Sequence, residues 1–172
     1  MPRELLILRH AKSAWDTDAP TDFERPLARR GLKAAPRMGK WIRRQKMIPD
    51  HIIASPARRA QQTVKLACKA MKVSKKEINQ DARIYGASTE DFLTILAETP
   101  KSAQRVMLVG HNPGLEFLFA YLCELPDNGP FDYEAGLIKT ATAVLLEMPD
   151  DWSTLPSGCA RLVVKQNPRQ LK

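Results

Sequence analysis

The strongest constraint on the fold is an alternation of short apolar runs with helical patterns. Three runs of strand length, Leu5–Leu8, His51–Ala54 and Val106–Val109, consist mostly of Leu, Ile and Val and do not alternate with polar residues. Such runs are typical of strands buried on both faces. Apolar residues recur at helical spacing over 60–71 and 115–122, with a weaker pattern over 92–96. The alternation predicts a three-layer α/β/α domain with a mainly parallel central sheet.

Length and composition predict one soluble unit. A chain of 172 residues and 19.4 kDa lies in the usual range for a single domain, which would then cover residues 1–172. No apolar run approaches the roughly 20 residues that a bilayer requires, and the first run is too short for a signal-peptide core. We therefore expect a cytoplasmic protein without membrane contact. The scattered cysteines Cys68, Cys123 and Cys159 predict free thiols, because their spacing fits neither a disulfide framework nor a zinc site.

Local signals place the remaining elements. Two further strands are expected over 141–148 and 160–165. Pro36 interrupts a helical pattern over 32–42, so that helix should begin near Ala35 or bend at the proline. The segment 125–136 collects Pro, Asp, Asn and Gly, which predicts a surface loop that could form a lid.

Cationic side chains stand directly after each of the three apolar runs. Arg9 and His10 follow the first run, the segment Ser55–Arg59 with its two arginines follows the second, and His111 follows the third after one glycine. The ligand crevice of an open α/β sheet lies outside the carboxyl ends of its strands. We therefore expect arginines and histidines to meet in one crevice.

Two of these strand ends also carry a helix-start signal. Ser55 precedes Pro56 and Asn112 precedes Pro113, each just before a helical pattern. Serine or asparagine at the N-cap with proline at the first helical position is a preferred helix start. The N–H groups and positive dipole of such helix ends attract anions. The crevice is thus predicted to bind phosphate or another compact oxyanion.

The chemistry of the crevice is predicted to need no metal and no other cofactor. Neither a glycine-rich phosphate loop nor a carboxylate pair suited to magnesium occurs near the strand ends. Arginine can grip two phosphoryl oxygens at once, and a neutral histidine nitrogen can attack phosphorus. The net charge of +8 favours acidic partners. Because the basic clusters lack interleaved aromatic residues, we read them as solvated helix faces and expect no nucleic-acid binding.

At these residues the sequence resembles the histidine phosphatase superfamily, also called phosphoglycerate mutase-like. Leu8–Ser13 resembles the Arg-His-Gly signature after the first strand of that family. Ser55–Thr63 matches the second motif, in which the arginine four residues after the serine is catalytic, and Val109–His111 matches the third, which supplies a second histidine. The resemblance runs from about Leu5 to Lys165 and implies the phosphoglycerate mutase-like α/β/α fold.

Within the superfamily the chain is most similar to the SixA-type phosphohistidine phosphatases. It shares their short length, the Arg25–Leu27 segment before Gly31, and the absence of an inserted cap. Four catalytic residues are implied by the matched motifs: His10, Arg9, Arg59 and His111. His10 would accept the phosphoryl group, and the other three would bind its oxygens and stabilise the transition state. Arg25 and Ser13 are expected to add substrate contacts, and water would then hydrolyse phosphorylated His10.

Two positions depart from the family pattern. Ala11 replaces the glycine of the signature, which matters only if that position requires a positive φ. Ala82 stands where phosphomonoesterases of the family carry a proton-donating glutamate. An alkoxide leaves poorly without a proton, whereas a phosphoramidate nitrogen is protonated more readily. The departure at Ala82 therefore favours phosphohistidine as substrate, with the adjacent Asp81 as an alternative proton donor.

Other side chains near the motifs have structural interpretations. Glu90 and Asp91 are expected to begin a helix capped by Ser88. Trp15 and Asp16, which follow the signature loop, could touch substrate, although Trp15 could equally serve packing.

Three functions compete at this point. The preferred hypothesis is removal of phosphate from phosphohistidine on a protein, and the nearest alternative is hydrolysis of a small sugar or nucleotide phosphate ester. A non-catalytic phosphate- or polyanion-binding module is the alternative from another class. The intact set of His10, Arg9, Arg59 and His111 argues against it, because binding alone does not require a nucleophile. We favour a monomer, although no sequence feature tests the oligomeric state.

Overall fold

The strands form one sheet whose carboxyl ends bring the predicted crevice together. A computed structural model of the chain describes residues 2–124 and 138–171. The sheet has six strands in the order β3-β2-β4-β1-β5-β6. In chain order they are β1 (Arg3–Arg9), β2 (His51–Ala54), β3 (Ile78–Gln80), β4 (Arg105–Gly110), β5 (Ala143–Met148) and β6 (Arg161–Gln166). The first four pair in parallel, and β5 and β6 extend the sheet in antiparallel pairs.

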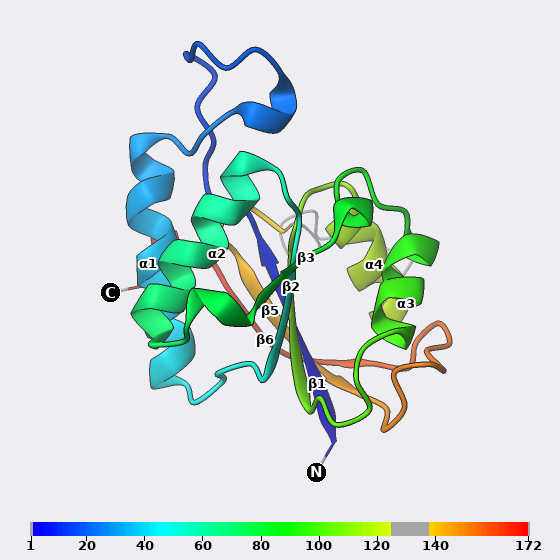
Figure 1. The fold of residues 1–172 in the computed structure, drawn as a ribbon. Helices are drawn as coiled ribbons and strands as arrows, with labels where there is room; N and C mark the ends of the chain where they lie inside the picture. The colour runs from blue at the N-terminus through cyan, green and yellow to red at the C-terminus, as the bar shows by residue number, and fades with distance from the viewer. Residues whose placement is uncertain (1, 125–137, 172) are drawn as a thin grey trace, which may run out of the picture.

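Helices cover both faces of the sheet, as predicted. α1 (Arg29–Arg44) and α2 (Arg58–Met71) lie on one face, and α3 (Thr89–Ala97) and α4 (Gly114–Cys123) lie on the other (Figure 1). Along β1, Leu6 and Leu8 belong to the core cluster beneath α1 and α2, whereas Leu5 and Ile7 belong to the cluster beneath α3 and α4. All four side chains are fully buried. The prediction of strands buried on both faces is confirmed.

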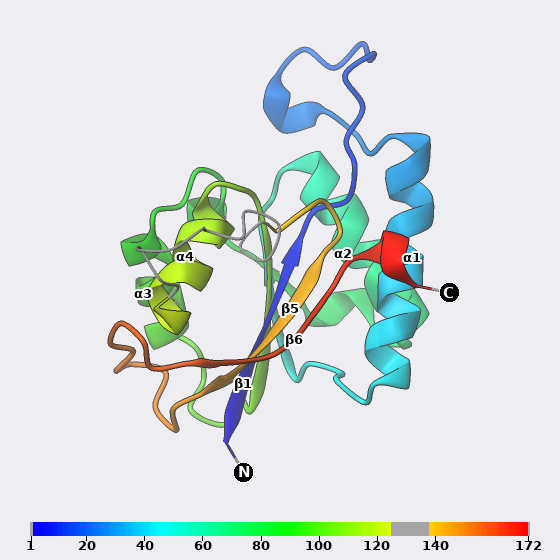
Figure 2. The ribbon, with the colours of Figure 1, turned by 180° about the vertical axis from the view of Figure 1, so that it is seen from behind.

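Short 3₁₀ turns complete the fold. They are η1 (Asp22–Glu24), η2 (Lys75–Glu77), η3 (Ala82–Ile84) and η4 (Pro168–Gln170). The segment between β1 and α1, which contains η1, extends beyond the carboxyl end of β1 (Figure 1). The C-terminal turn η4 lies beside α1 (Figure 2).

Of the two alternatives predicted for the first helix, a start near Ala35 is wrong, and the helix continues through Pro36. α1 begins at Arg29 and continues through Pro36 to Arg44, although proline offers no N–H to the carbonyl one turn earlier. Tight packing on α2 accounts for this, because a Cβ at Gly39 would collide with the carbonyl oxygen of Ala67. Burial of that helix face outweighs the missing hydrogen bond.

Smaller differences concern strand ends and caps. β5 begins at Ala143 rather than at 141, because Ala141 has a positive φ of 60°. The three-residue β3 was not predicted, since its exposed polar residues carry no strand signal. Ser88 caps α3 in a capping box with Asp91, as predicted. The segment 125–136, predicted as a loop and potential lid, lies outside the described residues.

The described part of the chain, 2–124 and 138–171, contains no helix long and apolar enough to cross a membrane. The three cysteines are free, and each is buried or half-buried.

Candidate active site

The carboxyl ends of β1, β2 and β4 enclose a cavity of about 330 Å³. Arg9 of β1 is paired in register with Gly110 of β4, so the next residues, His10 and His111, emerge side by side. Their ring centroids are 5.1 Å apart. The cavity is lined by Arg9, His10, Lys12, Ser13, Trp15, Arg25, Arg59, His111, Asn112 and Thr140. The structure thus brings together all six residues predicted for catalysis and substrate contact, while their roles stay predictions.

His10 is held with one ring nitrogen available for attack. Its Nδ1 lies 2.8 Å from the carbonyl oxygen of Ala11. A carbonyl only accepts hydrogen bonds, so Nδ1 carries the proton and Nε2 keeps its lone pair. Burial is the main cause that lowers the pKa of His10 to about 3, and the neighbouring charges of Arg9 and Arg59 act in the same direction. The ring is therefore neutral near pH 7, as a nucleophile requires.

His111 is also neutral and is positioned by Ser55. Its Nε2 and Ser55 Oγ are 2.7 Å apart, while its Nδ1 is buried without a partner among the described residues. Burial, followed by the charge of Arg59, lowers the pKa of His111 to about 4. If the Ser55 hydroxyl donates to Nε2, the ring proton is on Nδ1, where it is available to a phosphoryl oxygen.

The predicted capping roles of Ser55 and Asn112 are wrong. Ala57 is the N-cap of α2 and Pro113 that of α4, with no side-chain capping bond at either helix. Ser55 Oγ instead accepts from the N–H of Ala57 and contacts His111. Asn112 Nδ2 donates to Glu116 and to the carbonyl of Ile138. Ser55 therefore positions a residue of the cavity lining, and Asn112 itself lines the cavity, without either side chain capping a backbone N–H of the helix that follows.

Arg9 and Arg59 each keep part of the guanidinium free for an anion. Arg9 Nη1 donates to the carbonyl of Ile138 at 3.0 Å. Arg59 donates twice to Asp22, from Nη1 to its backbone oxygen at 2.7 Å and from Nη2 to Oδ2 at 2.9 Å. The Nε atoms of both arginines are buried and have no partner among the described residues. A buried donor without a partner is costly. The Nε–H of each guanidinium is therefore suited to donate to a phosphoryl oxygen.

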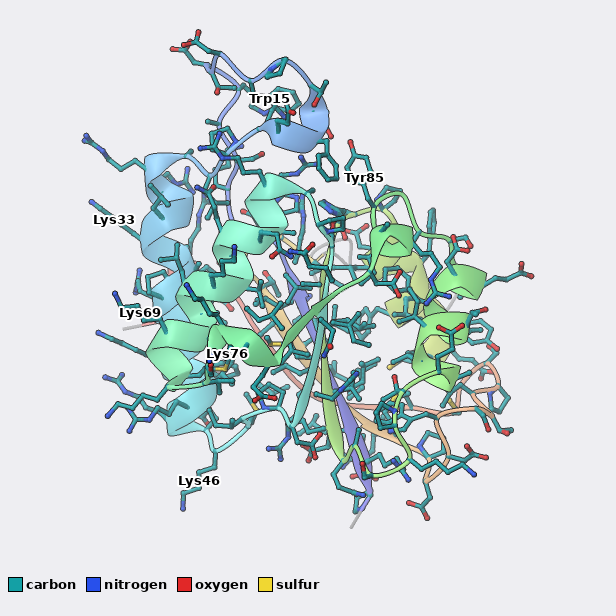
Figure 3. All side chains as sticks on the ribbon, in the orientation of Figure 1. Trp15, Lys33, Lys46, Lys69, Lys76 and Tyr85 are labelled. Atoms are coloured by element: carbon teal, nitrogen blue, oxygen red, sulfur yellow. The ribbon has the colours of Figure 1, made fainter. Side chains whose placement is uncertain are left out.

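Arg25 joins the cavity through the segment that follows β1. Its Nη1 donates to Ser13 Oγ and to the carbonyl of Ala14, each at 3.0 Å. Its guanidinium lies over the ring of Trp15 at 3.7 Å, an arrangement that favours a cation–π contact. Trp15 remains 74% exposed and lies at the same end of the molecule as Tyr85 (Figure 3). Asp16 is exposed and is not part of the cavity lining.

Asp22 and Tyr85, which were not predicted from the sequence, contact the lining residues Arg59 and His111 from outside the cavity. Asp22 Oδ1 accepts from Arg25 at 3.1 Å, and Oδ2 accepts from Arg59 and from the hydroxyl of Tyr85 at 2.7 Å. The Tyr85 hydrogen bond, followed by those of the two arginines, lowers the pKa of Asp22 to about 2. The Tyr85 ring also meets the His111 ring edge-on at 5.5 Å. The only sequence signal for Asp22 was its position three residues before Arg25.

Two side chains of α2 fix the loops that carry the site. Thr63 Oγ1 accepts from the N–H of Ala11 at 2.9 Å and donates to the carbonyl of Arg59 at 2.7 Å. Gln62 Oε1 accepts from the N–H of Leu27 at 2.6 Å. Ala11 is not among the described residues with positive φ, so alanine fits the place of the family's glycine without strain.

Asp81 lies outside the cavity lining. Its carboxylate accepts from the backbone and the guanidinium of Arg83, with the closest contact at 2.7 Å. These contacts, with the Arg83 side chain first, lower the pKa of Asp81. A lowered pKa keeps the carboxyl group ionised near neutral pH, which disfavours proton donation.

Comparison with known sequences agrees with this geometry. The protein-family model described as histidine phosphatase superfamily (branch 1) matches residues 5–92. This range includes the motifs Leu8–Ser13 and Ser55–Thr63. The chain belongs to the histidine phosphatase superfamily. Its sheet, with helices on both faces, has the phosphoglycerate mutase-like fold that the resemblance implied.

Relatives of this histidine phosphatase include proteins of several organisms. Phosphohistidine phosphatase SixA of Escherichia coli is 26% identical over 140 residues, which cover 81% of this chain and 84% of that protein. A SixA protein of Agrobacterium tumefaciens superimposes with a TM-score of 0.78 at 27% identity, covering 98% and 100% of the two chains. A mycobacterial glucosyl-3-phosphoglycerate phosphatase, with 94% and 97% coverage, has a TM-score of 0.66 at 18% identity, which is a likeness of fold alone.

Proposed function

We propose that this histidine phosphatase removes phosphate from phosphohistidine on a protein, without a metal ion, in the cytoplasm. The observation that carries the proposal is the lining of the catalytic cavity: among the described residues it contains histidines, arginines and a lysine but no carboxylic acid. Two carboxylates contact lining residues from outside the cavity: Glu116 accepts from Asn112, and Asp22 is ion-paired with Arg59, with a pKa of about 2. A substrate whose leaving group needs no acid from the protein is therefore favoured.

The reaction takes place in two steps at Nε2 of His10. Nε2 attacks phosphorus, the P–N bond of the substrate phosphohistidine breaks, and the departing imidazole, protonated on the substrate, leaves as a neutral ring. The unpartnered Nε edges of Arg9 and Arg59 hold the phosphoryl oxygens while charge spreads over them. Water then attacks the phosphorylated His10, which releases inorganic phosphate and regenerates the neutral ring.

The test follows label from a phosphorylated histidine domain. We expect the wild type to release labelled phosphate, His10→Ala to release none above the uncatalysed rate, and His51→Ala to match the wild type. A transient, acid-labile label on His10 should appear in rapidly quenched samples. Equal rates for the wild type and His10→Ala would contradict the proposal.

A screen of small phosphate esters separates the competing function. Because Asp81 lies outside the cavity, Asp81→Asn should leave turnover of phosphohistidine unchanged. High turnover of one small ester that Asp81→Asn abolishes would instead identify an esterase with Asp81 as its acid.

A further inference from the structure

A second cavity adjoins the catalytic one. It has a volume of about 520 Å³ and lies between α1 and the C-terminal turn η4. Arg9, Lys12 and Thr140 line both cavities, so the second opens beside the site where the phosphoryl group would sit. We refer to this second cavity as the basic groove.

Cations from separate parts of the chain line the basic groove. Arg30, Lys33 and Arg37 lie at successive helical spacings on one face of α1, and Lys139 and Arg169 face them from the segments before β5 and after β6. All five are exposed. Among residues 2–124 and 138–171, no carboxylate lines the groove, and none of the described ion pairs involves these cations.

The groove has a fixed shape rather than being a chance gathering of side chains. Arg37 Nη2 donates to the carbonyl of Leu171 at 3.0 Å, which joins α1 to the C-terminal segment. Asn167 Oδ1 accepts from the N–H of Arg169, and its Nδ2 donates to Thr142 Oγ1 at 2.9 Å. These bonds fix η4, which follows β6 and forms one side of the groove, in its position facing α1. Like charges kept this close repel each other, so an external anion would relieve the repulsion.

The extent of the groove argues for a protein partner. The catalytic cavity alone supplies the arginines and histidines that a phosphoryl group needs, whereas the groove cations are spread over three segments beyond it. A compact ester would leave most of them without a counter-charge. We propose that the basic groove binds acidic side chains on the surface of the phosphorylated protein, beside its phosphohistidine. This inference rests on the proposed function.

The test compares two pairs of charge reversals that change the net charge equally. Lys33→Glu/Arg169→Glu alters the groove, and Lys69→Glu/Lys76→Glu alters exposed lysines elsewhere; Lys33, Lys69 and Lys76 are labelled in Figure 3. With a phosphorylated acidic histidine domain as substrate, the groove variant should lose roughly 10- to 100-fold in kcat/KM, because charge complementarity mainly raises the association rate. The control should stay within about threefold.

Phosphoramidate, a small substrate, reports on the catalytic site alone. We expect the groove variant to hydrolyse it at nearly the wild-type rate, and added salt to reduce the wild-type rate more steeply on the protein substrate than on phosphoramidate. Equal losses on both substrates, or equal losses in the groove and control variants, would overturn the proposal.

A binding measurement distinguishes failure of the groove from failure of the proposed function. A labelled decaglutamate peptide should bind the His10→Ala protein, and should bind it about tenfold more weakly when Lys33 and Arg169 are also reversed. Equal peptide binding by His10→Ala with and without the two charge reversals would refute the proposal that the groove binds acidic side chains, whatever the substrate of the enzyme. Peptide binding that depends on the groove, together with a wild type that hydrolyses no phosphohistidine, would refute the proposed function instead.

Discussion

Replacing His10 by glutamine should make the protein less sensitive to acid. Burial lowers the pKa of His10 to about 3 in the folded protein, whereas the ordinary value of about 6.5 applies to the unfolded chain. Between these two values the unfolded chain binds a proton that the folded protein does not. Stability therefore falls as the pH drops below about 6.5 and continues to fall until the folded pKa is reached.

The expected magnitude follows from the two pKa values. One pH unit in this window corresponds to about 1.4 kcal/mol for one group. Between about pH 7 and about pH 5, titration of His10 should lower the free energy of unfolding by about 2 kcal/mol. Glutamine does not titrate, so His10→Gln should lose about 2 kcal/mol less than the wild type over the same interval.

The assay is urea unfolding at the two pH values in phosphate-free buffer, since a bound anion would favour protonated His10. The matched control is His51→Gln, because His51 is only partly buried and lies beside Asp50, so its effect should be smaller. If the wild type and His10→Gln lose the same free energy between the two pH values, His10 is not held as a buried neutral ring.

Three further predictions concern the site and its support. Ser55→Ala removes the partner of His111 Nε2 and should lower the free energy of unfolding by about 1–3 kcal/mol, measured by urea titration. Asp22→Asn weakens the charged contacts that orient Arg59 and should slow kcat by roughly tenfold; an unchanged kcat would remove Asp22 from the site. Gly39→Ala places a Cβ against Ala67 and should cost about 1–3 kcal/mol, whereas Lys40→Ala at the exposed neighbouring position should change stability by less than about 0.5 kcal/mol.

The layers of the fold could be predicted because buried runs constrain both faces of a strand. Leu5–Leu8 is apolar at every position, and the structure uses alternate residues in separate cores. The grouping of Arg9, His10, Arg59 and His111 followed from strand ends that parallel pairing brings to one edge. The sequence could not decide between a helix that begins near Ala35 and one that continues through Pro36, because the outcome depends on packing against α2 that no local pattern reports.

The missed site residues have a related physical cause. Asp22 and Tyr85 meet in space across a sequence separation of 63 residues, and neither stands in an apolar periodic pattern. The capping errors at Ser55 and Asn112 arose because a polar residue before proline satisfies the helix-start pattern whether or not its side chain turns to the helix. Ser55 instead bonds to His111 from the neighbouring strand end, and Asn112 bonds to the Glu116 side chain in the first turn of α4.

The contacts of Gln62 and Thr63 define what can be exchanged in this enzyme. They hold the backbone at Leu27 and Ala11, the two ends of the segment that carries Trp15 and Arg25. The segment between Ala11 and Leu27 could therefore be exchanged as a unit while α2 is left unchanged. The corresponding segments of relatives with other substrates should adopt the same position, as long as the backbone N–H groups at positions 11 and 27 still reach Thr63 and Gln62.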